Sequence, residues 1–214
     1  MNPGPTFDRV YLALKEQLLS GAFVPGAHLE PVAIGEHLNA SITPVRDALH
    51  RLVGERIVEA PRHNGFRVPA PTEAELRDLY GWNAELLGLA LRGACGRMRA
   101  DRAHGRAATV SASDLTAWHA ADLFRFVARR HGNPELEAAV ENMSDRLAPL
   151  RLAERAVFAD FEDEILVLRS LVAAWEAGAL RREVAAYHRR RQRQVPELLL
   201  AWRHLPGMPE TTIK

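Results

Sequence analysis

Arginines gather between residues 46 and 67 of this chain of 214 residues. That stretch holds five arginines and three acidic residues, whereas residues 1–45 hold two basic and four acidic residues. A planar guanidinium group can bind guanine O6 and N7 in a major groove or bracket a phosphate. This placement of charge favours contact with a nucleic acid, and a small α+β domain without that role is the alternative.

Three short helices are predicted to position these arginines. An apolar stripe runs along residues 7–19, and a second helix follows the turn at Pro25-Gly26. Ser41 is a good N-cap for the third helix, and Pro44 falls at its third position, where a missing amide costs nothing. The apolar positions of the three helices are Val10, Leu14 and Leu18, then Leu29, Val32, Ile34 and Leu38, then Val45, Leu49, Leu52 and Val53. The third helix would turn outward Thr43, Arg46, Asp47, His50 and Arg51.

A hairpin is expected directly after the third helix. Residues 57–59 and 66–68 flank the stretch 62–65, and its Asn64-Gly65 pair supplies the positive φ angles of a tight turn. Helix, helix, turn, helix and hairpin is the order of a winged helix-turn-helix.

The same region resembles the DNA-binding domain of the GntR family of bacterial transcription regulators, over about residues 7–70. The resemblance rests on the runs Ser20–Leu29 and Ile34–Leu52, on Gly54, on Ile57-Val58 and on Gly65-Phe66. It implies that Thr43 and Arg46 contact the operator from the recognition helix and that the wing tip around Gly65 reaches the minor groove.

One position departs from that family pattern. Members usually carry an arginine where this chain has Ile42, so the usual operator consensus is not expected, and an apolar side chain could instead meet a thymine methyl group. The predicted DNA-binding residues are Ile42, Thr43, Arg46, His50, Arg62, Asn64 and Gly65.

The sequence pattern changes at Pro69-Ala70-Pro71. The two prolines lack a backbone N–H donor and favour an extended backbone in the residues before them. Beyond it the pattern is helical, with five or six helices and breaks at residues 102–111, 132–134 and 158–160, and at Gly178. The predicted fold class is mainly α. The predicted domains are a winged helix-turn-helix at 1–70, an all-helical effector-binding and dimerisation domain at 71–205, and a tail at 206–214.

The helical part resembles the FadR-like (FCD) branch of that family, through His131–Leu136 and Trp175–Gly178. The resemblance implies a bundle that binds a small effector and contributes to dimerisation. Many members hold a divalent metal with an Asp and a His four residues apart and two later His. Counting from the glycines places Ala120, Phe124 and Leu168 at three of those positions, and only His188 lies near the fourth. No metal and no cofactor are therefore predicted.

Other polar residues in the helical part leave alternatives open. His119 and Asp122 could be a metal or acid/base pair or a capped helix end, and a relocated metal site could use these two with His131 and His188. Arginines within apolar helices would need an anion if they pointed inward. The predicted effector-binding residues are Arg92, Arg125, Arg146 and His188, and the effector is expected to carry a carboxylate or phosphate.

Composition limits the remaining choices. The net charge is +1, the single cysteine is Cys95, no signal peptide is recognisable and no run of about 18 apolar residues occurs. A cytoplasmic protein without a membrane segment is expected. The prediction is a homodimeric regulator, most simply a repressor, that binds a palindromic double-stranded DNA operator and responds to a small acidic metabolite. A dimer with a degenerate, ligand-free pocket is the alternative. An all-α enzyme with a fused adaptor domain is disfavoured, because no nucleophile and base set is recognisable.

Overall fold

The computed structural model describes residues 5–62, 64–103, 115 and 119–205. Within these ranges the chain forms two compact units. Residues 5–71, with 148–153 and 200–205, make the N-terminal unit, and residues 72–147 and 154–199 make the helical unit. The expected tail at 206–214, and most of the expected break at 102–111, lie outside the described residues.

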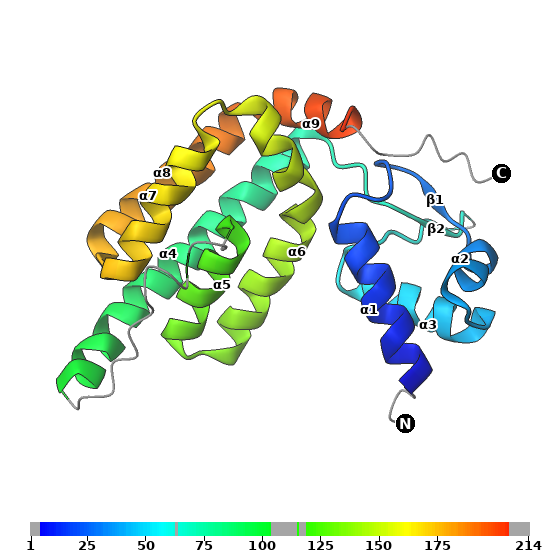
Figure 1. Cartoon of the computed structure of the whole chain (residues 1–214), viewed down its shortest axis with the longest axis horizontal. Helices are drawn as coiled ribbons and strands as arrows, with labels where there is room; N and C mark the ends of the chain where they lie inside the picture. The colour runs from blue at the N-terminus through cyan, green and yellow to red at the C-terminus, as the bar shows by residue number, and fades with distance from the viewer. Residues whose placement is uncertain (1–4, 63, 104–114, 116–118, 206–214) are drawn as a thin grey trace. The chain divides into compact units, whose positions relative to one another are not determined.

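Residues 5–71 of the N-terminal unit form three helices and a small sheet (Figure 1). In chain order these are α1 (Pro5–Leu19), β1 (His28–Leu29), α2 (Pro31–Leu38), α3 (Ile42–Gly54) and β2 (Phe66–Arg67). Helices α1 and α2 both pack on α3. The predicted apolar stripes of α1 and α3 are confirmed, since Val10, Leu14, Val45, Leu49 and Leu52 are all fully buried. Burial of these side chains holds the recognition-type helix rigidly against the rest of the unit.

The second helix begins later than the sequence pattern predicted. Leu29 lies in β1, where it pairs with Phe66 of β2, so its assignment to a helix was wrong. Glu30 has an extended backbone and Pro31 opens α2, because proline suits a first helical position but interrupts any earlier helical turn. Val32, predicted on the apolar face of this helix, is 57% exposed.

The wing differs from the expected two-strand hairpin. Strand β2 pairs antiparallel with β1, and residues 57–59 contribute a single bridge, between Glu59 and Arg67. Both amides of that bridge donate to the opposite carbonyl at 2.9 Å. Strand β1 pairs with one edge of β2. The local sequence pattern does not reveal this pairing, because the two strands are far apart in the sequence. Gly65 has the expected positive φ, 62°.

The second part of the chain is helical, as predicted. Six helices are described in it: α4 (Glu73–Ala103), α5 (Ala120–His131), α6 (Pro134–Val157), α7 (Phe161–Ala174), α8 (Ala177–Arg193) and α9 (Val195–Arg203). In the helical unit, α4 packs against α5 and α8, and α7 packs against α8 and α5 (Figure 1). The mainly α fold class is therefore confirmed.

Local chemistry explains most of the helix ends. Gly132 ends α5 with a left-handed backbone, and the Asn133 side chain caps α6 by accepting the amides of Glu135 and Leu136. The predicted break at Gly178 was wrong, because Gly178 lies inside α8. Trp175 itself adopts the left-handed conformation, at φ 50°, and ends α7 three residues earlier.

None of the helices in the described ranges is both long enough and apolar enough to cross a bilayer.

Candidate functional site

The exposed face of α3 carries the predicted recognition residues. Thr43, Arg46 and His50 are all exposed, and Ile42 is 46% exposed, while the opposite face is buried. Among the residues that the structure describes, Arg46 makes no hydrogen bond or ion pair. The His50 ring meets Phe66 of β2 edge-on, with ring centroids 5.0 Å apart. The helix therefore presents one free guanidinium group between an apolar start and an imidazole that contacts β2.

A close backbone approach sets the angle between α2 and α3. A Cβ atom on Gly35 would lie 2.7 Å from the carbonyl oxygen of Ala40, so only glycine fits there without a shift. Asn39 closes α2 in the left-handed conformation, at φ 49°. The Arg9 guanidinium donates to the carbonyls of Leu38 and Asn39 at 2.8 and 3.2 Å. A cation at the C-terminal end of a helix complements its dipole and stabilises this turn.

The rear of α3 is tied to α1 by a polar cluster. Glu55 accepts hydrogen bonds from Tyr11 at 2.7 Å and from Lys15 at 2.9 Å, and Arg51 donates to it at 3.3 Å. The Arg51 guanidinium also lies 3.9 Å from the Tyr11 ring centroid. Burial acts to raise the pKa of Glu55, but these hydrogen bonds and the Lys15 charge outweigh it and lower that pKa. Burial and the bond to Glu55 raise the pKa of Tyr11.

The wing places its predicted contact residues at the surface. Arg62, Asn64 and Gly65 are all exposed, and His63 lies outside the described residues. Arg67 is held by Glu59 at 2.7 Å, across the bridge between the two segments. Of the five arginines between residues 46 and 67, two therefore have internal carboxylate partners, namely Arg51 and Arg67. Arg46, Arg56 and Arg62 have none within the described part of the chain, so they can approach phosphates or bases.

The predicted effector residues have separate surroundings in the structure. Arg92 is exposed on α4. Arg125 pairs with the buried Asp145 at 2.7 Å and approaches Asp122 at 3.6 Å. Arg146 is half-buried and lies 3.7 Å from the sulfur of Met143. His188 is buried, and its Nε2 atom lies 3.0 Å from the Asn83 side-chain nitrogen.

The surroundings of His188 define its hydrogen-bonding state. Its Nδ1 atom lies 2.7 Å from the carbonyl of Val184, which can only accept, so this nitrogen carries the proton. The Nε2 atom then accepts a hydrogen bond from the Asn83 amide. The rings of Phe124 and Tyr187 lie 5.3 and 5.1 Å from the His188 ring. Both nitrogens of His188 are therefore used inside an aromatic cluster.

The three positions at which the FadR-like resemblance would place metal ligands lie in this core. Ala120, Phe124 and Leu168 are buried, and Phe124 touches His188. No group of three or more His, Cys, Asp or Glu side chains with metal-binding geometry occurs among the described residues. The Asp122 carboxylate accepts the amide of His119 at 3.0 Å, so these two residues form a capping box at the start of α5.

The sequence did not point to Arg191, a cation that is fully buried in the helical unit. Arg191 and Glu154 are both fully buried and pair at 3.0 Å, and Glu164 lies 2.5 Å from the same guanidinium. Tyr187 donates to Glu154 at 2.8 Å and places its ring 3.4 Å from the Arg191 guanidinium carbon. Burial acts against the charged form of Arg191, yet Tyr187, Glu154 and Glu164 raise its pKa. Burial raises the pKa of Glu164, against the pull of Arg191.

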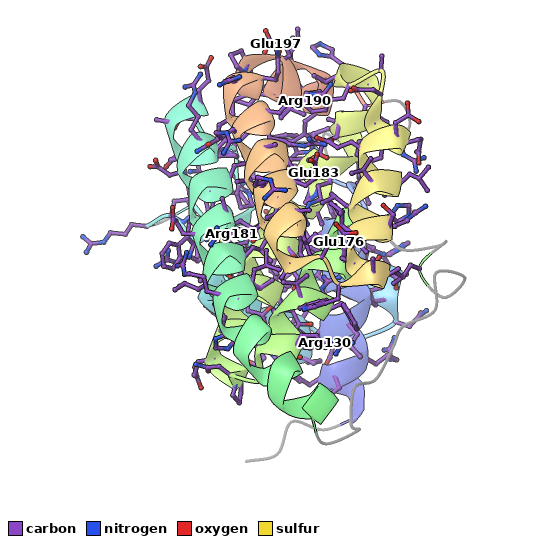
Figure 2. The ribbon with its side chains drawn as sticks, turned by 90° about the vertical axis from the view of Figure 1, so that its left-hand side faces the viewer. Arg130, Glu176, Arg181, Glu183, Arg190 and Glu197 are labelled. Atoms are coloured by element: carbon purple, nitrogen blue, oxygen red, sulfur yellow. The ribbon has the colours of Figure 1, made fainter. Side chains whose placement is uncertain are left out.

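Arg191 could not be singled out from the sequence, because it belongs to a run of arginines in α8. Six arginines occur between residues 181 and 193, and such clusters are most often solvated. Figure 2 shows Glu176 at the junction of α7 and α8, with Arg181, Glu183 and Arg190 following along α8. The one available signal is spacing, since Arg191 follows the buried Val184, Tyr187 and His188 at helical intervals.

Comparison with known proteins follows the same division of the chain. Residues 6–68 match the family model described as "Bacterial regulatory proteins, gntR family". Over 80 residues the chain is 39% identical to the HTH-type transcriptional regulator McbR of Escherichia coli (strain K12), and over 76 residues it is 32% identical to the HTH-type transcriptional repressor GlaR of the same strain. These alignments cover 36% of this chain and 36% and 34% of the two relatives, so the matched segment spans about a third of their length.

Two solved structures share the fold over most of the chain. E. coli McbR/YncC has a TM-score of 0.65 at 22% identity, over 91% of this chain and 99% of the other. A putative transcriptional regulator GntR from Rhodococcus sp. RHA1 has a TM-score of 0.65 at 17% identity, over 89% and 97% of the two chains. At these identities the likeness establishes the fold of both parts of the chain.

Proposed function

We propose that this chain, whose residues 6–68 match the gntR family of bacterial regulatory proteins, is a homodimeric transcriptional repressor of that family whose operator affinity is set by a small acidic metabolite. Its relatives are regulators and not enzymes, as predicted from the sequence. DNA is the partner of the N-terminal unit, and the helical unit is the sensor. DNA binding implies a cytoplasmic location.

One observation carries the DNA-binding part of this proposal. Arg46 and Thr43 project from the exposed face of a helix whose other face is fully buried, and Arg46 has no partner in the described part of the chain. A free, well-anchored guanidinium group at the start of a recognition helix suits bidentate contact with guanine. Arg62, Asn64 and Gly65 extend the contact from the wing, where an arginine can enter a minor groove.

A palindromic operator requires two copies of this surface. In a dimer the two recognition helices must match half-sites about one helical turn apart, roughly 34 Å. An effector changes operator affinity only if it binds better to one arrangement of the dimer than to the other. The proposed mechanism is therefore thermodynamic linkage between the helical units and the recognition helices.

The chemistry of the helical unit supports an acidic effector. The Nε atom of Arg125 is buried and has no hydrogen-bond partner among the described residues, although its Nη2 atom binds Asp145. A carboxylate or phosphate would satisfy such a donor with a charge-assisted hydrogen bond. Arg92, Arg146 and His188 stay in the proposed set from the sequence, although their surroundings differ from those of Arg125, and no metal ion is assigned to the set.

Titration of an operator complex tests the whole proposal. An operator is first selected from a randomised duplex pool with the full chain, and the complex is then titrated with monocarboxylates, dicarboxylates and sugar phosphates. We expect one class to release the DNA and to lose that effect in Arg125→Gln. The absence of any enriched sequence would refute the regulator itself.

A second candidate function is a DNA-binding dimer that senses no ligand. It is favoured by the bonding of His188, whose two nitrogens are both engaged, and by the packing of Phe124 against it. Specific operator binding that none of the metabolite classes alters would support this candidate and reject the sensor.

A further inference from the structure

A hollow lies on the N-terminal unit where α2 ends and α3 begins. Its volume is about 530 Å³, and Val32 and Ile42 line it together with Pro31 and Ala40. Val32 is 57% exposed and Ile42 is 46% exposed, so two β-branched apolar side chains are offered to solvent around one depression. Large apolar side chains exposed side by side mark a contact surface more often than isolated ones do.

The hollow continues the proposed DNA-binding face. Ile42 and Arg46 are four residues apart on α3, so they lie on the same face of the helix. A base edge within reach of Arg46 is therefore adjacent to one within reach of Ile42. The hollow is rimmed by Glu36, the charged residue of its lining, whose carboxylate would repel a phosphate. An uncharged part of the DNA fits this place better than the backbone does.

From this geometry we infer that Val32 and Ile42 form an apolar reader of the C5-methyl group of thymine, which sets the operator preference beside the base pair contacted by Arg46. The inference rests on the proposed DNA-binding function. Thymine is the base that presents a methyl group in the major groove, and apolar side chains recognise it by contact. The two residues would therefore select which base pair is preferred. Ile42 would contact a thymine methyl group, whereas an arginine at this position would bind guanine.

Removal of single methyl groups from the DNA tests this inference directly. Each thymine of the selected operator is replaced in turn by deoxyuridine, which pairs identically but lacks the C5-methyl group, and affinity is measured by fluorescence anisotropy. At one or two thymines of each half-site we expect wild-type affinity to fall about three- to fivefold, the factor for one buried methyl group. Replacing such a T·A pair by 5-methylcytosine paired with guanine should retain more affinity than an unmethylated C·G pair.

Variants connect the effect to the two side chains. Ile42→Ala should bind the thymine and deoxyuridine operators equally at that position, Val32→Ala should reduce the difference, and Ile42→Arg should select guanine there. Leu166→Ala removes an apolar side chain that is 61% exposed on α7, more than either Val32 or Ile42, and should keep the full methyl effect. Because all three residues are exposed, thermal melting should confirm that each variant folds.

The outcomes separate the inference from the function on which it rests. Specific binding with no penalty from deoxyuridine at any position overturns the methyl reader and leaves the regulator standing. A penalty that is unchanged in both Ile42→Ala and Val32→Ala also overturns it. Equal affinity for selected and random duplexes overturns the proposed function itself.

Discussion

Individual arginines of the two units have opposite roles, as Arg46 and Arg191 show. In the N-terminal unit Arg46 and Arg62 are exposed and have no partner among the described residues. In the helical unit Arg191 is fully buried between two carboxylates and two aromatic rings. A guanidinium group left free in water is available to DNA at little desolvation cost, whereas a buried one is satisfied internally and contributes to the fold. Exposure and pairing, and not residue type, decide which arginines can serve binding.

Removing the buried cation should have the largest effect on stability. Arg191→Met leaves Glu154 and Glu164 without their partner in a low-dielectric core, and we expect a loss of about 3–5 kcal/mol in the free energy of unfolding. Chemical denaturation of the full chain measures it. Arg189→Met, two residues away on the exposed side of α8, should change that free energy by less than about 0.5 kcal/mol. Equal losses in the two variants would contradict the contrast.

Removing the exposed cation should act on DNA binding and not on folding. Arg46→Ala should weaken operator binding by about 1–3 kcal/mol and relax the preference at one base pair, with an unchanged melting temperature. Thr43→Ala should cost less. Competition between operator and random duplex separates the two roles, because an equal loss on both would identify Arg46 as a phosphate contact only.

The wing cation should have a smaller and less selective effect. Arg62→Ala should weaken binding to all sequences by a similar factor and lower the slope of log affinity against log salt by about 1. Affinity measured at several salt concentrations gives this slope directly. Arg67→Ala, whose arginine is already paired with Glu59, should leave the slope nearly unchanged, and a larger change than in Arg62→Ala would reverse the assignment.

A change in the polar cluster of Tyr11, Lys15, Arg51 and Glu55 should have the smallest effect on stability, and this effect should depend on pH. The folded-state pKa of Glu55 is lowered, so its stabilisation is present above the ordinary glutamate value of 4.5 and is lost as the pH falls through the folded value. Glu55→Gln should therefore cost about 1 kcal/mol or less near neutral pH and nothing in acid. Melting curves of both proteins between pH 3 and 7 test this convergence, and a gap that widened in acid would have the wrong sign.

Particular residues show how far the sequence could predict the site. The outward set on α3 was correct because a helical period of 3.6 residues separates the buried Val45, Leu49 and Leu52 from Thr43 and Arg46. The partner of β2 was missed, because β1 lies almost forty residues earlier and strand pairing is not a local property. The sequence left two interpretations of His119 and Asp122, a capped helix end or a metal or acid/base pair. The hydrogen bond between them supports the capped helix end.

The sequence by itself determined most of the helices and the resemblance of residues 6–68 to the gntR family, since helical periodicity, caps and turn residues act over a few positions. The expectation that Ala120, Phe124 and Leu168 replace metal ligands came from the FadR-like resemblance and stays a prediction. Tertiary structure alone decided which charges are free. Arg51, Arg67 and Arg191 are paired with carboxylates of the same chain, so they are not available to an outside ligand. The partner Glu154 lies 37 positions from Arg191 in the sequence. The strength of a charge in a protein depends on its burial and on its partners, and both are set by packing between segments that the local pattern cannot bring together.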